Sequence, residues 1–235
     1  MVLIDSVYQK ILALSNKEQR GYITPQEFNL FANKAQTEIF DAYFHNLKTS
    51  YVKPGSNMTH GDERDILEEK IHPFKTSTTF TQVEVSTGVF SDTITLPNEL
   101  YLIEGLFRAE GEIVELDKSE VIYTESHPLT KANINRSVYT RDVPGGLKIY
   151  PRPLLSTSIT LNYFKKPTKV KWGYVVIQDK ALYNAVTSTN FEFHASEEEV
   201  LVSRILQLAG VVTMKPELIQ MGVADQSAIK QDQND

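Results

Sequence analysis

Residues of the types that carry out chemistry are present in this chain, but their spacing does not bring them together. The five histidines are scattered, with no pair four residues apart on a helix and no HExxH sequence, so we expect surface or core histidines and no metal ligands. They are His45, His60, His72, His127 and His194. The chain contains no cysteine, which excludes disulfide bonds and thiolate metal sites.

Carboxylates gather between residues 62 and 69, the second place where chemistry could occur. They alternate with Arg64 and Lys70 at helical spacing, which favours a solvated helix face over a pair of acid–base catalysts. The carboxylates are Asp62, Glu63, Asp65, Glu68 and Glu69. A small carboxylate-based hydrolase is therefore kept only as a remote alternative.

The loop signatures of ligand-binding and catalytic sites are also missing. The stretch from Asp117 to Glu125 lacks the glycine and the terminal glutamate of a calcium loop. Gly145 and Gly146 neither begin a helix nor carry a Walker lysine, so they do not form a phosphate cradle, and no GxSxG sequence is present. We therefore expect a protein that is not an enzyme, with no catalytic, cofactor-binding or metal-binding residues, no cofactor and no small-molecule substrate.

A basic cluster follows the clearest strand of the chain, in the sequence SITLNYFKKPTKVKWGY. Ile159, Leu161 and Tyr163 alternate with more polar positions, and Pro167 ends the strand because it lacks a backbone donor. For the lysines we weigh contact with phosphate, a solvated strand exit, and an ion-pair surface between subunits. The lone tryptophan is typical of an anchor against a neighbouring element or subunit. The candidate partner or subunit contacts here are Lys165, Lys166, Lys169, Lys171 and Trp172.

The composition is that of a folded protein and excludes several classes. With 235 residues, 41% of them apolar, the chain can form one large domain or two small ones. A net charge of −6 argues against a dedicated nucleic-acid binder, so a DNA-binding module is a second remote alternative. No apolar run reaches the roughly 18 residues of a membrane span, and the N-terminal MVLIDSVYQK lacks signal-peptide features. We expect no membrane partner, and synthesis in a cytoplasm.

Helical patterns fill the chain from about Ile4 to His72. A long helix from Thr24 to about Thr49 has the best-defined start, because Thr24 and Glu27 form a capping box, Pro25 suits the first helical position, and a hydrophobic staple flanks them. A short helix precedes it, and a third is predicted over residues 63–71 after a loop broken by Pro54, Gly55 and Gly61. The staple pair and the buried residues of the first helix are Ile23, Phe28, Val7, Ile11 and Leu14.

The period of the apolar residues changes to two from Thr76 to about Phe193. Strands are predicted over residues 80–85, 89–96, 101–109, 112–116, 137–141, 147–150 and 158–164, with edge strands over 175–177 and 190–193 and a short helix over 118–124. Helix then returns. Ser196 and Glu199 have capping-box spacing before a helix that reaches Val212. A final helix after Pro216 has a thin apolar stripe, which we take as a candidate contact with a neighbour: Leu218, Ile219, Val223 and Ile229.

These patterns predict an α+β fold, in which N- and C-terminal helices form a bundle beside a mostly antiparallel β domain. We place the helical N-terminal part at residues 1–75, the β-rich domain at 76–193, and the C-terminal helical part at 194–235, where it completes the bundle and ends in a polar tail.

Four segments, in order along the chain, resemble a family of virion proteins from short-tailed phages, in particular the crAss-like phages of Bacteroides and their marine relatives. Together the segments span nearly the whole chain. They are SNKEQRGYITPQEFNLFANKAQTEIFDAYF, LPNELYLIEGLF, SHPLTKANINRSVYTR and ITLNYFKKPTKVKWGY, the last followed by a C-terminal helix. The resemblance implies a helical part and a β-rich part, as in the tail-adaptor proteins of other podoviruses.

The same resemblance implies a ring or neck component below the portal. We therefore expect a head-to-tail connector subunit that assembles into a closed ring around the DNA channel, a dodecamer by analogy with a twelvefold portal. Expected partners are further copies of the chain, the portal protein, adjacent ring or tail proteins, and passing genomic DNA without specificity. The expected location is the neck or tail of the virion, after assembly in the host cytoplasm. A tail-hub or nozzle component of the same tail is the alternative.

Overall fold

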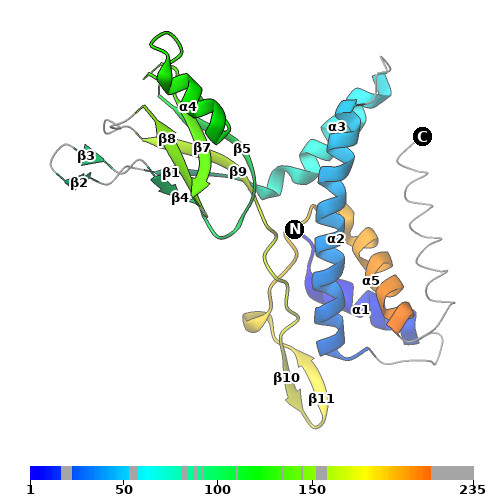
Figure 1. Cartoon of the computed structure of the whole chain (residues 1–235). Helices are drawn as coiled ribbons and strands as arrows, with labels where there is room; N and C mark the ends of the chain where they lie inside the picture. Colours follow the sequence, from blue (N-terminus) through cyan, green and yellow to red (C-terminus); the bar gives the residue numbers. More distant parts are fainter. Residues whose placement is uncertain are drawn as a thin grey trace. The chain divides into compact units, whose positions relative to one another are not determined.

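The computed structural model describes residues 1–16, 23–52, 58–80, 84–86, 89–90, 93–109, 111–133, 135–143, 145–151 and 158–212. The chain has an α+β fold, as predicted, with a helical part and a mostly antiparallel sheet (Figure 1). It divides into two compact units. The helical unit consists of Met1–Pro73 and the described part of Pro167–Asp235, and the sheet unit is Phe74–Lys166. The units thus divide after residues 73 and 166, whereas the sequence suggested divisions after 75 and 193.

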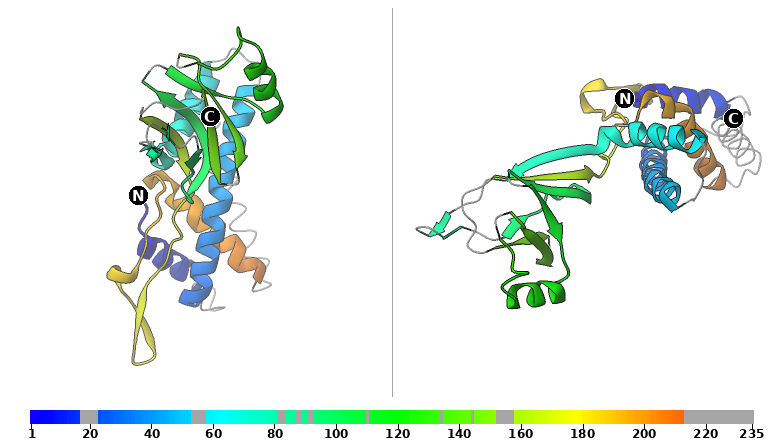
Figure 2. Two further views of the ribbon diagram at one scale, coloured as in Figure 1. Left: turned by 60° about the vertical axis from the view of Figure 1, so that its left-hand side comes forward. Right: turned by 90° about the horizontal axis from the view of Figure 1, so that it is seen from above.

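Four α-helices form the framework of the helical unit: α1 (Ile4–Asn16), α2 (Pro25–Val52), α3 (Met58–Ile71) and α5 (Glu198–Val212). Helix α2 contacts both α3 and α5, and α1 packs on α5, so helices from both ends of the described chain share one core (Figure 2). The bundle of N- and C-terminal segments is therefore confirmed. Its buried apolar residues include Val7, Tyr8, Ile11, Phe28, Ala32, Ala35, Ile39, Phe40, Tyr43, Leu201, Ile205 and Leu206.

Helix α2 begins as the sequence predicts. The backbone N–H of Thr24 donates to the Glu27 carboxylate at 2.9 Å, and the Glu27 N–H donates to the Thr24 hydroxyl at 3.3 Å. These reciprocal bonds are a capping box and satisfy two otherwise unpaired donors of the first turn. Ile23 and Phe28 are both buried, as a hydrophobic staple requires.

Two predicted helix starts are wrong. Helix α3 begins at Met58 and includes Gly61, which the sequence marked as a breaker. A glycine inside a helix costs only about 1 kcal/mol relative to alanine, which the rest of the helix can offset. At the start of α5, Ser196 donates its backbone N–H to the ring of His194 and lies in a short 3₁₀ turn, η3 (Ala195–Glu197), so the predicted Ser196–Glu199 capping box does not form.

The sheet unit contains a seven-stranded sheet of order β1-β9-β5-β6-β7-β8-β4. All neighbouring strands are antiparallel except β6 and β7, and helix α4 (Lys118–Ser126) lies between these two along the chain. One apolar cluster on the sheet includes Leu106, Ile149, Leu161 and Tyr163. The strands are β1 (Lys75–Phe80), β4 (Thr93–Thr95), β5 (Leu100–Arg108), β6 (Gly111–Glu115), β7 (Val138–Val143), β8 (Gly146–Tyr150) and β9 (Ile159–Lys165).

Most predicted strands are confirmed, but three are not. The strand predicted over residues 80–85 is divided between the end of β1 and β2 (Glu84–Ser86), which belong to different sheets. The single strand predicted over residues 89–96 is divided into β3 (Val89–Phe90), which pairs with β2 (Glu84–Ser86), and β4, which pairs with β8 in the large sheet. The two segments pair with different strands and therefore belong to different sheets. The edge strand predicted over residues 190–193 is only a single bridge, between Val2 and Phe191.

A separate two-stranded sheet belongs to the helical unit. Strands β10 (Tyr174–Ile177) and β11 (Lys180–Tyr183) pair antiparallel, with Ile177 opposite Lys180 and Tyr174 opposite Tyr183. We call residues 174–183 the arm. The edge strand predicted over residues 175–177 is confirmed within it.

Candidate interaction site

The residues first considered for chemistry remain apart in the structure. Among the described residues, no group of three or more histidines, aspartates or glutamates is placed so that it could hold a metal ion. The histidines whose side chains are described are all exposed: His45, His72, His127 and His194. On α3, Asp65 and Glu69 are exposed as well, as expected of a solvated helix face.

The four lysines at the exit of β9 are divided between the two units. Lys165 ends β9 and Lys166 follows it, both in the sheet unit, while Lys169 and Lys171 belong to the helical unit. Lys166, Lys169 and Lys171 are exposed. Their contact with a partner stays a prediction. The other proposed contact residues lie outside the described part of the chain: Leu218, Ile219, Val223 and Ile229.

Trp172 is an internal anchor of the helical unit. Its side chain is 2% exposed, and its indole Nε1 donates to Asp5 Oδ1 at 2.9 Å. Its ring centre lies 4.5 Å from that of Tyr8 on α1, and it stacks on Tyr174 at 5.8 Å. A side chain so fully buried offers almost no area to another subunit. Trp172 therefore supports the base of the arm from inside the helical unit and is a poor candidate for a contact residue.

Side-chain amides of α2 hold the extended segment that leads to the arm. Asn29 Oδ1 accepts the Trp172 N–H at 2.7 Å and its amide donates to the Trp172 carbonyl at 3.3 Å. Asn33 forms the same pair with Val170, at 3.0 and 2.8 Å, and Gln36 donates to the Thr168 carbonyl at 2.8 Å. We call these three residues the amide ladder.

The spacing of the amide ladder explains its regularity. From Asn29 to Asn33, four helical residues rise about 6 Å, which is close to the roughly 6.6 Å that two residues of a strand advance, so these two rungs stay in register. Gln36 lies three residues further along α2, about 4.5 Å, and its longer side chain reaches Thr168. The opposite edge of the segment is held by Lys171, which exchanges backbone hydrogen bonds with Thr189 at 2.8 and 3.2 Å. The base of the arm is therefore fixed from both sides.

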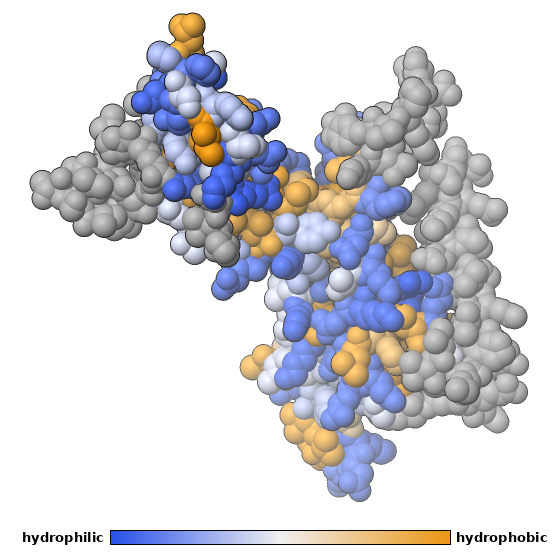
Figure 3. All heavy atoms as spheres, viewed as in Figure 1, coloured by the Kyte–Doolittle hydropathy of each residue, from blue (hydrophilic) through white to orange (hydrophobic). Residues whose placement is uncertain are grey.

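The arm itself has the structure of a tight hairpin. Gln178 and Asp179 both have positive φ, 50° and 61°, as a two-residue type I′ turn requires. No third strand pairs with β10 or β11 in the described chain. Its apolar side chains are unusually exposed, and Figure 3 shows an apolar patch on it at the lower end of the view. The exposed fractions are Val175 46%, Val176 61%, Ile177 53%, Leu182 49% and Tyr183 39%.

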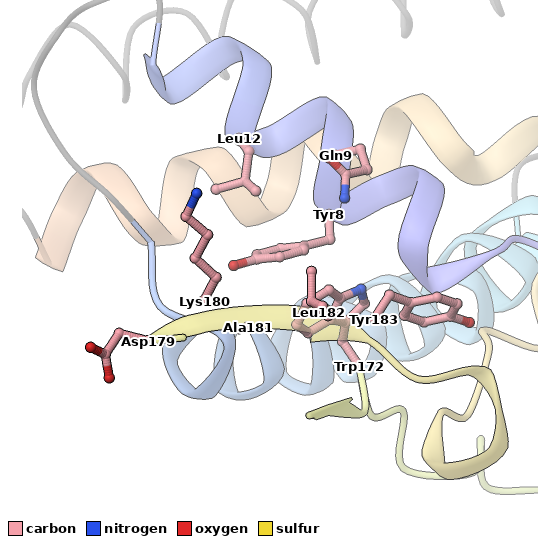
Figure 4. A pocket seen from close by; sticks show the side chains of 9 residues that line it. All are labelled: Tyr8, Gln9, Leu12, Trp172, Asp179, Lys180, Ala181, Leu182 and Tyr183. Atoms are coloured by element: carbon pink, nitrogen blue, oxygen red, sulfur yellow. The ribbon is translucent and has the colours of Figure 1, made fainter. Parts of the chain in front are cut away.

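A pocket of about 460 Å³ lies between α1 and strand β11. Tyr8, Gln9 and Leu12 line it from α1, Trp172 lines it from the base, and five consecutive residues, 179–183, line it from the arm. In Figure 4 the Tyr8 ring and Leu12 lie above β11, and Lys180 rises beside them while the Asp179 carboxylate points away. We call this pocket the arm groove.

The acidic residues at the end of η3 and the start of α5 are paired across the helical unit. Glu197 is 3% exposed and lies 2.9 Å from the ammonium of Lys70, which is 14% exposed. Ser6 donates to Glu198, which holds the pKa of that carboxyl below its ordinary value, and Lys10 lies 3.2 Å away. A hydrogen bond with Glu199 in turn raises the pKa of Lys10. These carboxylates fasten α5 to α1 and α3, beyond the helix-dipole role expected from the sequence.

A second exposed apolar set lies in the sheet unit. On α4, Ile122 is 62% and Tyr123 71% exposed, and Leu129 after the helix is 96% exposed. None of these side chains lines the arm groove.

No family model matches the chain, and no curated protein matches it. Among the helices of the described part, none combines the length and hydropathy that a bilayer-spanning segment needs. The exposed apolar arm and the groove beside it are the features of the described chain that indicate an interaction site.

Proposed function

We propose that this chain is a virion structural protein of a short-tailed phage, a subunit of a ring in the head-to-tail connector beneath the portal. The four segments that resemble this family support the family assignment. The observation that carries the structural role is the arm, an exposed apolar hairpin on a rigid base. Its place in the virion neck, its location around the DNA channel and its lack of enzymatic activity are parts of the same proposal.

The arm supports a role in assembly on energetic grounds. A two-stranded hairpin is marginally stable in water by itself, and three or more strands or a packed face are needed for independent stability. Large exposed apolar patches on soluble proteins often mark interaction sites, and the arm exposes apolar side chains on both of its faces. An arm with five apolar side chains about half exposed is therefore expected to be covered by another chain.

The charge of the chain is compatible with a DNA channel. A net charge of −6 opposes tight binding of phosphate, and a surface that DNA must slide past benefits from weak attachment. The exposed Lys166, Lys169 and Lys171 are available for partner contacts or for transient contact with DNA.

Native mass spectrometry and electron microscopy of the purified chain with its portal protein test the proposal. We expect closed rings, twelvefold by analogy with a twelvefold portal, seated on the portal. Symmetric dimers alone, or no association, would contradict it. A position at the far end of the tail would favour the tail-hub or nozzle alternative, and DNA retention that falls steeply with salt would favour a DNA-binding module.

A further inference from the structure

We draw no further inference here: the strongest candidate, the exposed apolar arm of residues 174–183 with the groove between its strand β11 and helix α1, carries nothing beyond the proposed role in assembly, because nothing in the described part of the chain shows what covers it.

Discussion

Replacing Asn33 by leucine removes the middle rung of the amide ladder. The side chain accepts the Val170 N–H at 3.0 Å and donates to the Val170 carbonyl at 2.8 Å, in a part-buried position. Leucine leaves both backbone groups without these partners, and its helix propensity is higher than that of asparagine. Because leucine does not weaken α2 itself, the loss of stability in this variant reports the hydrogen bonds that the ladder loses.

The expected cost follows from the two lost hydrogen bonds. A part-buried polar group left unsatisfied costs about 1–3 kcal/mol, and leucine returns up to about 0.5 kcal/mol through its higher helix propensity. We expect Asn33→Leu to lower the free energy of unfolding by about 2–4 kcal/mol. For a protein of this size that corresponds to a fall in melting temperature of about 6–12 °C.

Urea and thermal denaturation of the full chain measure this cost. The matched control is Lys34→Ala on the next residue, because the Lys34 side chain is 62% exposed and only approaches Glu38, at 4.0 Å. Its effect should stay within about 0.5 kcal/mol. Amide hydrogen exchange adds a local measurement: the Val170 amide should exchange faster in Asn33→Leu, while Trp172, still held by Asn29, should change less. A variant as stable as the control, with Val170 still protected, would refute the assignment of the ladder.

Three further predictions address other parts of the chain. Lys70→Met should destabilise the protein by about 3–5 kcal/mol because it leaves Glu197 buried without its partner, and Lys70→Met/Glu197→Leu should recover most of the loss in urea denaturation. Because the folded-state pKa of Glu198 is lowered from 4.5, its stabilising effect is present above that pH and is lost as the pH falls through the lowered pKa; Ser6→Ala should therefore reduce the melting temperature at pH 7 more than at pH 3. Truncation at Met214 should leave the melting temperature nearly unchanged but abolish incorporation into particles if the segment with Leu218, Ile219, Val223 and Ile229 docks on a neighbour, whereas a truncated chain that unfolds would assign that segment to the core of its own subunit.

Local signals account for what the sequence predicted well. The start of α2 depends on Thr24, Pro25 and Glu27, which lie within four residues of one another, and the structure forms the bonds that their types predict. The buried face of β9 follows in the same way from the alternation of Ile159, Leu161 and Tyr163. In both cases the interacting groups are neighbours in sequence, so their pattern is sufficient.

Long-range partners account for what was missed. Asn29 and Asn33 look like the polar face of a helix, and their partners Trp172 and Val170 are more than a hundred residues away. A signal did exist, because amides four residues apart on a helix can reach alternate residues of an extended segment. Nothing in the sequence, however, indicates that Asn29 and Asn33 lie beside the segment that contains Val170 and Trp172. Strand β11 was missed because its turn, Gln178-Asp179, has neither the asparagine nor the glycine that usually marks a type I′ hairpin.

The sheet unit is an uninterrupted run of chain placed inside the sequence of the helical unit. Its first and last strands, β1 and β9, are hydrogen-bonded neighbours, with Lys75 opposite Phe164, so the chain enters and leaves at one place. On the ribosome this order makes the two units finish at different times. The sheet unit is complete at Lys166, but α1 and α2 must wait for α5, which ends at Val212, and at about 5–20 residues per second that delay lasts several seconds. The helical core that supports the base of the arm is thus completed only after the sheet unit.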